Sequence, residues 1–424
     1  MRQNSNFLFT VVFSLLLVGM LLIFNFEMAL AYNSPVELTF WNIWVGPNPD
    51  YKVMISRVEE FNKSHSDINI KMQRIPHDQY KTKIKIQAAG GQLPDLIQTW
   101  PGEELRPLVE GGTLMPIDEI VGYWKNNLIP ASQFKDYSID GRVYAIPGNI
   151  VYTHTIYYNK DLLKSVGYNE FPGTYNEFKV LIKKLRGNNI IPIALGNKGK
   201  WVLQSCFLST IGDRVAGEEF LTKVMEGKKK FTDPEFIKSL KVIKELSDIK
   251  AFNLDANSLN NIQQRQYFYQ GKAAMYVEGT WALGDVINKA KNIDVGVATF
   301  PEIEGEKAPK SLSGVSGYGI SLNANLSKKE KEAAFQFLKY FYSEKLYKGF
   351  LKVGTFVPAK VTVTDVDPLM KKEMELVQKY HIAPVYDAVL PVDITNVLNN
   401  GLQSLIAGMI TPEKLAKELQ KSLD

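Results

Sequence analysis

Apolar and polar residues in the first part of the chain alternate with the periods of strands and helices in turn. Residues 36–41 and 68–72 show the two-residue period of a strand, and residues 96–98 form a short apolar run. Between them, residues 51–65 carry apolar side chains at helical spacing, and residues 80–89 form a second helix that ends at two glycines. This order of strands and helices predicts a doubly wound α/β unit, whose ligands lie beyond the carboxyl ends of the strands.

A second α/β unit is predicted from about residue 144 onward. Thr174 and Glu177 form the capping box of one of its helices. Further strands are expected at residues 190–194, 273–277, 295–298 and 319–322, and further helices at 160–166, 175–186, 201–211, 233–248, 328–342 and 397–423. Because the chain shows no short repeat, low-complexity tract or flexible linker, we expect two lobes joined by several crossing strands.

The amino terminus has the pattern of a secretory signal peptide, which we place at residues 1–31. Arg2 supplies a positive start, residues 7–24 form an apolar run, and Ala29-Leu30-Ala31 is a small-x-small cleavage site. The alternative is an uncleaved membrane anchor, because the run is long enough to span a bilayer. No cysteine follows the run, which excludes a lipid anchor on a modified cysteine.

Composition and charge exclude several classes of protein. The 50 Lys and Arg residues against 45 Asp and Glu give a net charge of +5 without a dense basic run, which argues against nucleic-acid binding. The single cysteine, Cys206, excludes an internal disulfide and a thiolate cluster, and the four histidines lack the spacing of metal ligands. Neither a nucleophile elbow nor a phosphate loop is present. We therefore expect no metal, no cofactor and no catalytic residue.

The tryptophans are the distinctive feature, because five of the six follow predicted strands or begin helices in loops. An aromatic face outside a core stacks on the C–H face of a pyranose ring, and nearby polar groups bind its hydroxyls. For each tryptophan alone, core packing is the alternative. The candidate aromatic residues are Trp41, Trp44, Trp100, Trp201 and Trp281, and the candidate polar residues near them are Asn42, Gln98, Thr99 and Asn149.

Several motifs, in order and spacing, resemble those of the extracellular solute-binding proteins of bacterial ABC sugar importers, the group that includes maltose-binding protein. The most specific motif is GKAAMYVEGTWA at residues 271–282. The others are LTFW at 38–41, GGQLPDL at 90–96, YAIP at 144–147, YYNKDLL at 157–163, FPGTYNEF at 171–178, GYGI at 317–320 and GMITPE at 408–413.

This resemblance implies a periplasmic-binding-protein-like fold: two doubly wound α/β lobes, a hinge of several segments, and a ligand cleft between the lobes. By likeness, the amino-terminal lobe takes residues 32–149 and 297–342, and the carboxy-terminal lobe takes residues 150–294 and 345–424. The chain then crosses near residues 145–151, 293–297 and 341–344. The resemblance also implies ligand contacts at Trp281, Gly317 and Tyr318, whereas the family's late aromatic contact has no match near Asp393 and Thr395.

We therefore expect a monomeric, non-enzymatic binding protein that is exported to the periplasm or the outer face of the membrane. Its expected partners are a small carbohydrate and a membrane ABC permease. One alternative in the same fold is a binder of a phosphorylated polyol or another charged molecule, for which Arg106 and Lys200 are the nearest cations. The other is a secreted enzyme acting on polysaccharide, which needs a carboxylate pair that nothing in the sequence singles out.

Overall fold

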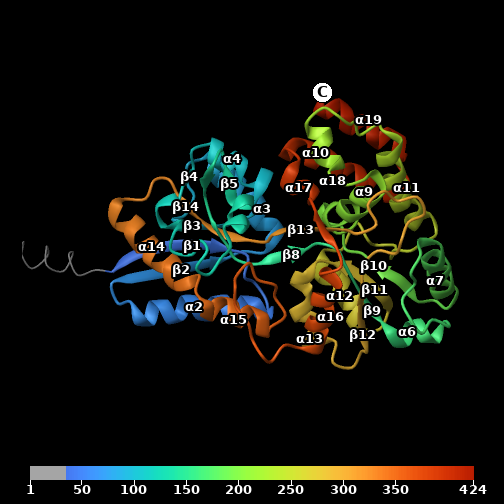
Figure 1. Ribbon diagram of the computed structural model, residues 1–424, viewed down its shortest axis with the longest axis horizontal. Coiled ribbons are helices and arrows are strands. Elements are labelled where there is room, and N and C mark those ends of the chain that lie inside the picture. The colour runs from blue at the N-terminus through green and yellow to red at the C-terminus, as the bar shows by residue number, and fades with distance from the viewer. Residues whose placement is uncertain (1–34) are drawn as a thin grey trace, which may run out of the picture.

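The computed structural model describes residues 35–424 and divides them between two lobes (Figure 1). The signal peptide expected at residues 1–31 lies outside the described residues. The first lobe is built on a sheet in the order β2-β1-β3-β14-β4, in which β7 also pairs with β14. Its strands are β1 (Val36–Asn42), β2 (Ile68–Arg74), β3 (Leu96–Thr99), β4 (Leu114–Met115), β7 (Ile146–Pro147) and β14 (Gly319–Asn323).

Alternation along β1 gives the first lobe one buried layer on each face of its sheet. Leu38 and Phe40 point into a core that is completed by helices α2 (Pro49–Ser64), α14 (Lys328–Phe341) and α15 (Glu344–Lys352). On the other face, Tyr80 and Ile84 of helix α3 (His77–Ala89) pack with Ile97 of β3. Strands β2 and β3 both run parallel to β1, so their carboxyl ends lie at one edge of the sheet.

The second lobe is built on a four-stranded sheet in the order β10-β11-β9-β12, with β9 antiparallel to both of its neighbours. Its strands are β9 (Thr155–Asn159), β10 (Ile191–Ala194), β11 (Ala273–Glu278) and β12 (Val295–Ala298). Its longer helices are α7 (Tyr175–Gly187), α9 (Ser209–Ala216), α11 (Pro234–Asp248), α12 (Asn261–Tyr269), α13 (Leu283–Lys289), α16 (Pro368–Val377), α18 (Val392–Ile406) and α19 (Pro412–Leu423). Within residues 35–424, no helix has both the length and the apolar character to cross a bilayer.

Short elements complete both lobes. Those of the first lobe are the 3₁₀ helices η1 (Gly102–Glu104) and η2 (Ala131–Tyr137), helices α4 (Arg106–Glu110) and α5 (Asp118–Val121), and strands β5 (Ser138–Ile139) and β6 (Arg142–Val143). Those of the second lobe are α6 (Lys160–Ser165), α8 (Trp201–Leu203), the π-helical turn η3 (Gln204–Leu208), α10 (Phe220–Met225), the 3₁₀ helix η4 (Thr280–Ala282) and α17 (Tyr386–Val389).

Side-chain caps fix where several of the predicted helices begin. Asn159 accepts hydrogen bonds from the backbone N–H groups of Asp161 and Leu162 at the start of α6. Thr174 and Glu177 form the predicted capping box of α7, and Ser327 caps α14 in the same way. Each cap satisfies backbone donors that the first helical turn leaves without partners.

Two antiparallel strands lie between the lobes: β8 (Ile150–Tyr152) and β13 (Ser311–Ser316), with β15 (His381–Ala383) on the outer side of β13. Figure 1 shows β8 and β13 running from one lobe to the other across the centre of the molecule. The structure thus confirms the predicted α/β class with two lobes joined by several crossing segments.

Two expected crossings lie elsewhere. Residues 293–297 do not cross, because β12 pairs with β9 inside the second lobe, and the crossing at that stage is β13. Residues 341–344 do not cross either, because Leu346 and Phe350 of α15 are buried in the first lobe's core with Phe40. Residues 297–298 therefore belong to the second lobe and residues 345–352 to the first, and the chain crosses after α15.

Candidate functional site

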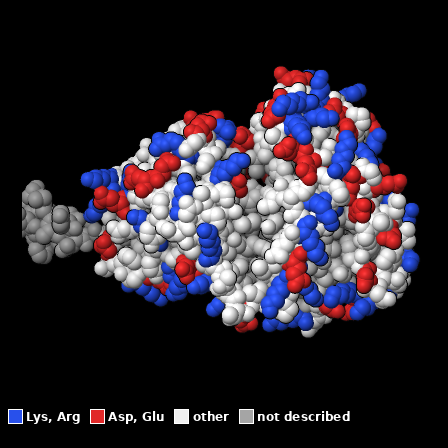
Figure 2. Space-filling view, in the orientation of Figure 1, with Lys and Arg blue, Asp and Glu red and all other residues white. Residues whose placement is uncertain are grey.

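Among the contacts between the lobes, two lie across the surface on which the parallel strands of the first lobe end. Gly102 in η1 lies against Ala388 in α17, so that a Cβ on Gly102 would lie 2.0 Å from the carbonyl oxygen of Ala388. The ring of His77, at the start of α3, lies 5.7 Å from the ring of Trp201. The surface between the lobes is hollowed in the space-filling view (Figure 2). This place is where an α/β protein of this topology binds its ligand.

Four aromatic rings form a continuous row from the first lobe to the second. The centroids of Trp100 and His77 are 5.5 Å apart, those of His77 and Trp201 are 5.7 Å apart, and those of Trp201 and Trp281 are 5.9 Å apart. All four side chains are partly exposed rather than buried. Three of the five candidate tryptophans are thus brought together, and His77 connects them across the lobes.

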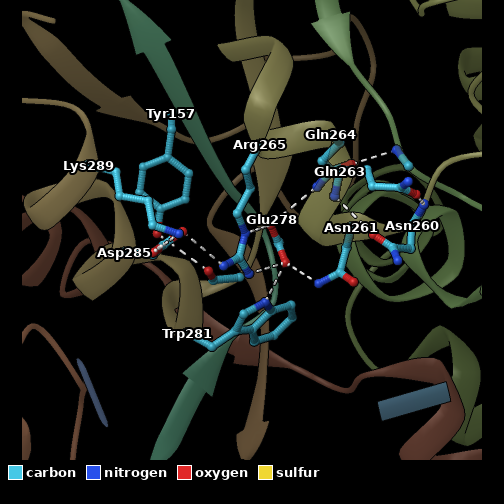
Figure 3. A network of polar contacts seen from close by, with 12 residues as sticks. Tyr157, Asn260, Asn261, Gln263, Gln264, Arg265, Glu278, Trp281, Asp285 and Lys289 are labelled. Carbon is cyan, nitrogen blue, oxygen red and sulfur yellow. Dashed lines mark hydrogen bonds and ion pairs between the residues drawn. The ribbon is translucent and has the colours of Figure 1, made fainter. Parts of the chain in front are cut away.

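Trp281 follows β11 and is held from behind by a buried polar network (Figure 3). Its indole N–H donates to Glu278 Oε1 at 2.8 Å. Glu278 pairs with Arg265, whose Nε and Nη2 donate to the two carboxylate oxygens at 2.7 Å each. Arg265 Nη1 also lies 3.4 Å from Asp285 Oδ2, and Lys289 closes the chain of charges at 2.8 Å from Asp285 Oδ1.

Trp44 is not part of the row, and the structure corrects the prediction that it binds ligand. Its side chain is 1% exposed and packs against Phe40, with ring centroids 5.1 Å apart, and against Phe341, with ring planes 3° apart. The chain turns back after β1, where the backbone N–H of Val45 donates to the carbonyl of Ile43. This turn directs Trp44 into the core of the first lobe instead of the space between the lobes.

The candidate polar residues at the ends of β1 and β3 are buried. Asn42 Oδ1 accepts from the backbone N–H of Trp44, and Thr99 Oγ1 lies 2.7 Å from Ser321 Oγ. The Nδ2 atom of Asn42 and the Nε2 atom of Gln98 have no hydrogen-bond partner among the described residues. These two amides therefore retain donors at the strand ends, whereas the Thr99 hydroxyl is already bonded inside the sheet.

Trp41 lies on the α3 face of the first sheet, where Trp100 packs against the same core. The ammonium group of Lys83, on α3, lies 3.7 Å from the centroid of the Trp41 ring, and Trp41 packs with the core beneath that helix. One face of the Trp41 ring is thus covered by a cation of its own lobe, and Lys81 covers one face of Trp100 in the same way.

Asn149, Gly317 and Tyr318 form a tight contact between the two crossing segments. Asn149 Oδ1 accepts from the backbone N–H of Tyr318 at 3.1 Å, and a Cβ on Gly317 would lie 2.1 Å from the same oxygen. The Tyr318 hydroxyl donates to Asp50 Oδ2 at 3.4 Å, and burial raises the pKa of Asp50 to about 6. Because their polar atoms bind one another and Asp50, these three residues hold the crossing segments together.

Several residues near the row were missed by sequence reasoning. The ammonium group of Lys81 lies 3.4 Å from the centroid of the Trp100 ring and pairs with Glu104. Asp387 lies across from them, at the start of α17. The side-chain amide of Gln204, in the orientation that gives both its oxygen and its nitrogen a partner, donates to Asp387 Oδ2 at 3.1 Å. Burial, together with the charge of Glu104, raises the pKa of Asp387 to about 7 against the opposing effect of Lys81.

The sequence held one signal for the missed part of the site. His77 follows β2, whose carboxyl end lies beside that of β1, so the same strand-end rule that selected Trp100 applies to it. Asp387 comes from a short helix without apolar periodicity, and its position near Glu104 depends on the contact between lobes. Within residues 35–424, no three His, Cys, Asp or Glu side chains gather as metal ligands. Aromatic faces rimmed by amides and carboxylates are suited to a neutral ring that carries hydroxyls.

Comparison with known proteins agrees with this geometry. The chain is 25% identical over 313 residues to the Multiple sugar-binding protein of Streptococcus mutans, covering 70% of this chain and 69% of that one. It is 29% identical over 309 residues to the Maltotriose-binding protein of Pyrococcus abyssi, covering 70% of this chain and 61% of that one. The solved structure of a chitin oligosaccharide binding protein matches with a TM-score of 0.84 and 25% identity, covering 92% of this chain and 98% of that one.

A family model described as bacterial extracellular solute-binding protein matches residues 46–348. The match includes the first lobe's helices α2 and α3, both crossing strands and the whole of the aromatic row. Since it extends over more than half of the chain, the protein belongs to the family of bacterial extracellular solute-binding proteins.

Proposed function

We propose that this protein captures a carbohydrate between its two lobes and delivers it to the permease of an ABC transporter. The observation that carries the proposal is the row of rings, because it begins at Trp100 in the first lobe and ends at Trp281 in the second. Pyranose rings stack on aromatic faces through their C–H groups, and their hydroxyls bind to amides and carboxylates. Asp387 and Glu104 supply such acceptors near the row.

The relatives support the same class of ligand. Two of them are named for binding sugars, one of these for maltotriose, and the solved structure is named for chitin oligosaccharide. A phosphorylated ligand requires a cation that is free to pair with it. Lys81, a cation at the row, is already paired with Glu104, and Arg106 is paired with Glu103. These contacts favour a neutral sugar over a charged one.

The two-lobed architecture supplies the mechanism. A sugar in contact with both Trp100 and Trp281 binds more tightly when the lobes are together than when they are apart. Ligand therefore shifts the population towards the conformation in which Gly102 meets Ala388, and the permease distinguishes this conformation from the open one. We further propose that the protein acts as a monomer outside the cytoplasm and leaves its ligand chemically unchanged.

A thermal-shift screen tests the ligand class, because a ligand that binds only the folded protein raises its apparent stability by RT ln(1 + [L]/Kd). The library contains maltotriose, chitin trisaccharide, stachyose and xylan oligosaccharides, with glycerol 3-phosphate as the charged control. We expect at least one neutral sugar to raise Tm and the phosphate ester to have no effect. Chromatography of that sugar after prolonged incubation should recover it intact. A shift with the phosphate ester alone, or cleavage of the sugar, would contradict the proposal.

A further inference from the structure

Glu278, at the end of β11, is a fully buried carboxylate that receives five hydrogen bonds. Its Oε1 atom accepts from Asn261 Nδ2 and Arg265 Nη2 at 2.7 Å each, and from Trp281 Nε1 at 2.8 Å. Its Oε2 atom accepts from Arg265 Nε at 2.7 Å and Gln264 Nε2 at 3.2 Å. Two carboxylate oxygens offer about four lone-pair sites, so this group has no capacity left for a ligand.

The donors to Glu278 come from two directions. Asn261, Gln264 and Arg265 lie on the first turns of α12, whereas Trp281 lies in η4, directly after the strand. Figure 3 shows the carboxylate between the guanidinium group of Arg265 and the indole of Trp281. Helix α12 thus fixes the carboxylate, and the carboxylate in turn fixes the pyrrole edge of the indole.

The opposite edge of the indole rests on Gly279. A Cβ on this residue would lie 2.1 Å from Cζ3 of Trp281 and 2.5 Å from Cε3 and Cη2. The φ angle of Gly279 is −77°, which every residue adopts. Glycine is therefore needed here because a side chain would clash with the ring, and not because of the backbone conformation. One edge is therefore hydrogen-bonded, the other is packed on a glycine, and the neighbouring ring of Trp201 lies 5.9 Å away.

We propose that Glu278 is a positioning residue, which orients the indole ring of Trp281 before ligand arrives. A tryptophan ring has two flipped orientations about its outer side-chain bond, and the N–H bond to Glu278 selects one of them. A ring that is ordered in advance spares the complex the entropic cost of ordering it on binding. This inference rests on the proposed function, because the value of a fixed ring depends on a sugar that stacks on it.

Two variants disturb the ring in different ways, and each has a matched control. Glu278→Gln replaces one acceptor oxygen by an amide NH₂ group, which is itself a donor and faces the donors that the carboxylate accepted from. Asp285→Asn is its control, because Asp285 contacts Arg265 but not Trp281. Gly279→Ala places a methyl group against the ring without a change of charge. Its control is Gly173→Ala, because a Cβ at Gly173 meets nothing within 4 Å.

The orientation of the ring is measured first, without a sugar. The six tryptophans give six indole N–H cross-peaks in a ¹⁵N-labelled sample, and Trp281→Phe identifies the peak of Trp281. We expect Glu278→Gln and Gly279→Ala to move this peak and to speed its exchange with solvent, and both controls to leave it in place. If the peak and its exchange rate are unchanged in Glu278→Gln, Glu278 does not position the ring. Gly279→Ala displaces the ring while the buried ion pair stays intact, so it tests separately whether the orientation of the ring controls affinity.

Titration with maltotriose and chitin trisaccharide then measures the consequence. Ordering one side chain on binding corresponds to about a two- to tenfold loss of affinity, which we expect for Glu278→Gln and for Gly279→Ala. In a Trp281→Phe background, Glu278→Gln should have no further effect, since phenylalanine lacks the N–H group. Loss of affinity in Trp281→Ala with wild-type affinity in both positioning variants overturns this inference alone. Wild-type affinity in Trp281→Ala removes the ring from the site, and with it the observation on which the proposed function stands.

Discussion

Gly102 and Ala388 meet backbone to backbone across the two lobes, at a distance that leaves no room for a side chain. Gly102 has a φ angle of +65°, and a Cβ on it would lie 2.0 Å from the carbonyl oxygen of Ala388. The glycine thus serves a turn in its own lobe and a close approach to the other lobe. Of these two roles, only the close approach to Ala388 affects ligand capture, because this contact exists only when the lobes are together.

We predict that Gly102→Ala prevents the lobes from meeting, whereas Gly112→Ala does not. Gly112 has a φ angle of +64° and nothing within 4 Å of an added Cβ, so both variants carry the same backbone cost of about 1–2 kcal/mol. We expect Tm to fall equally in both and sugar affinity to fall, by roughly tenfold, in Gly102→Ala alone. Small-angle scattering should show a smaller radius of gyration with sugar in wild type and Gly112→Ala, but not in Gly102→Ala. Equal compaction in the two variants would show that this contact does not limit closure.

Trp281 and Trp44 separate ligand binding from folding. We predict that Trp281→Ala weakens sugar binding by about 1–3 kcal/mol, because it removes a partly exposed aromatic face. Trp44→Ala should instead cost about 3–5 kcal/mol of unfolding free energy, because it empties a site between Phe40 and Phe341. Calorimetry of sugar binding and thermal melts of both sugar-free variants measure the two quantities. A stability loss without an affinity loss in Trp281→Ala would be evidence against stacking.

The different positions of these two tryptophans show what the sequence reveals and what it does not. Local patterns predicted most of the strands and helices, and residues such as Thr174 and Ser327 mark helix starts through hydrogen bonds to their own neighbours. Trp44 and Trp281 both follow strands in polar loops, so no local pattern distinguishes them. What buries Trp44 is Phe341, almost three hundred residues later, and a single sequence does not show such a pairing.

The same lack of long-range information explains why two crossing segments were predicted at the wrong positions and why Asp387 was not predicted near the site. Helix α15 has a strong apolar face, but its sequence does not say which lobe that face covers, and the structure places Phe350 with the first lobe. Asp387 lies in a short segment without apolar periodicity, and it becomes part of the site through contact between the lobes. Trp100, Trp201 and Trp281 are candidates from the sequence because the strand ends of α/β units are a local feature with a fixed spatial meaning, and their contact with ligand stays a prediction.

The last prediction concerns Glu373 of α16, a buried carboxyl whose Oε1 atom accepts from the hydroxyl of Thr155 on β9. Its Oε2 atom has no partner among the described residues, and burial raises the pKa of Glu373 from 4.5 to about 8. Between pH 4.5 and about pH 8, Glu373 therefore keeps its proton in the folded protein and releases it in the unfolded chain. Folding stability therefore falls as pH rises from about 5 to about 8, on the order of 3 kcal/mol from this group.

Glu373→Gln removes this dependence, because the amide keeps an oxygen for Thr155 and does not ionise. We expect the difference in unfolding free energy between Glu373→Gln and wild type to grow in favour of the variant from pH 5 to pH 8, and to change little below pH 5. Glu375→Gln, at an exposed position on the same helix, is the control and should follow the wild-type curve. Urea unfolding at a series of pH values gives the three curves. Parallel curves for wild type and Glu373→Gln would mean that Glu373 is ionised in the folded protein at neutral pH, and the carboxylate would then need a partner that Thr155 alone does not provide.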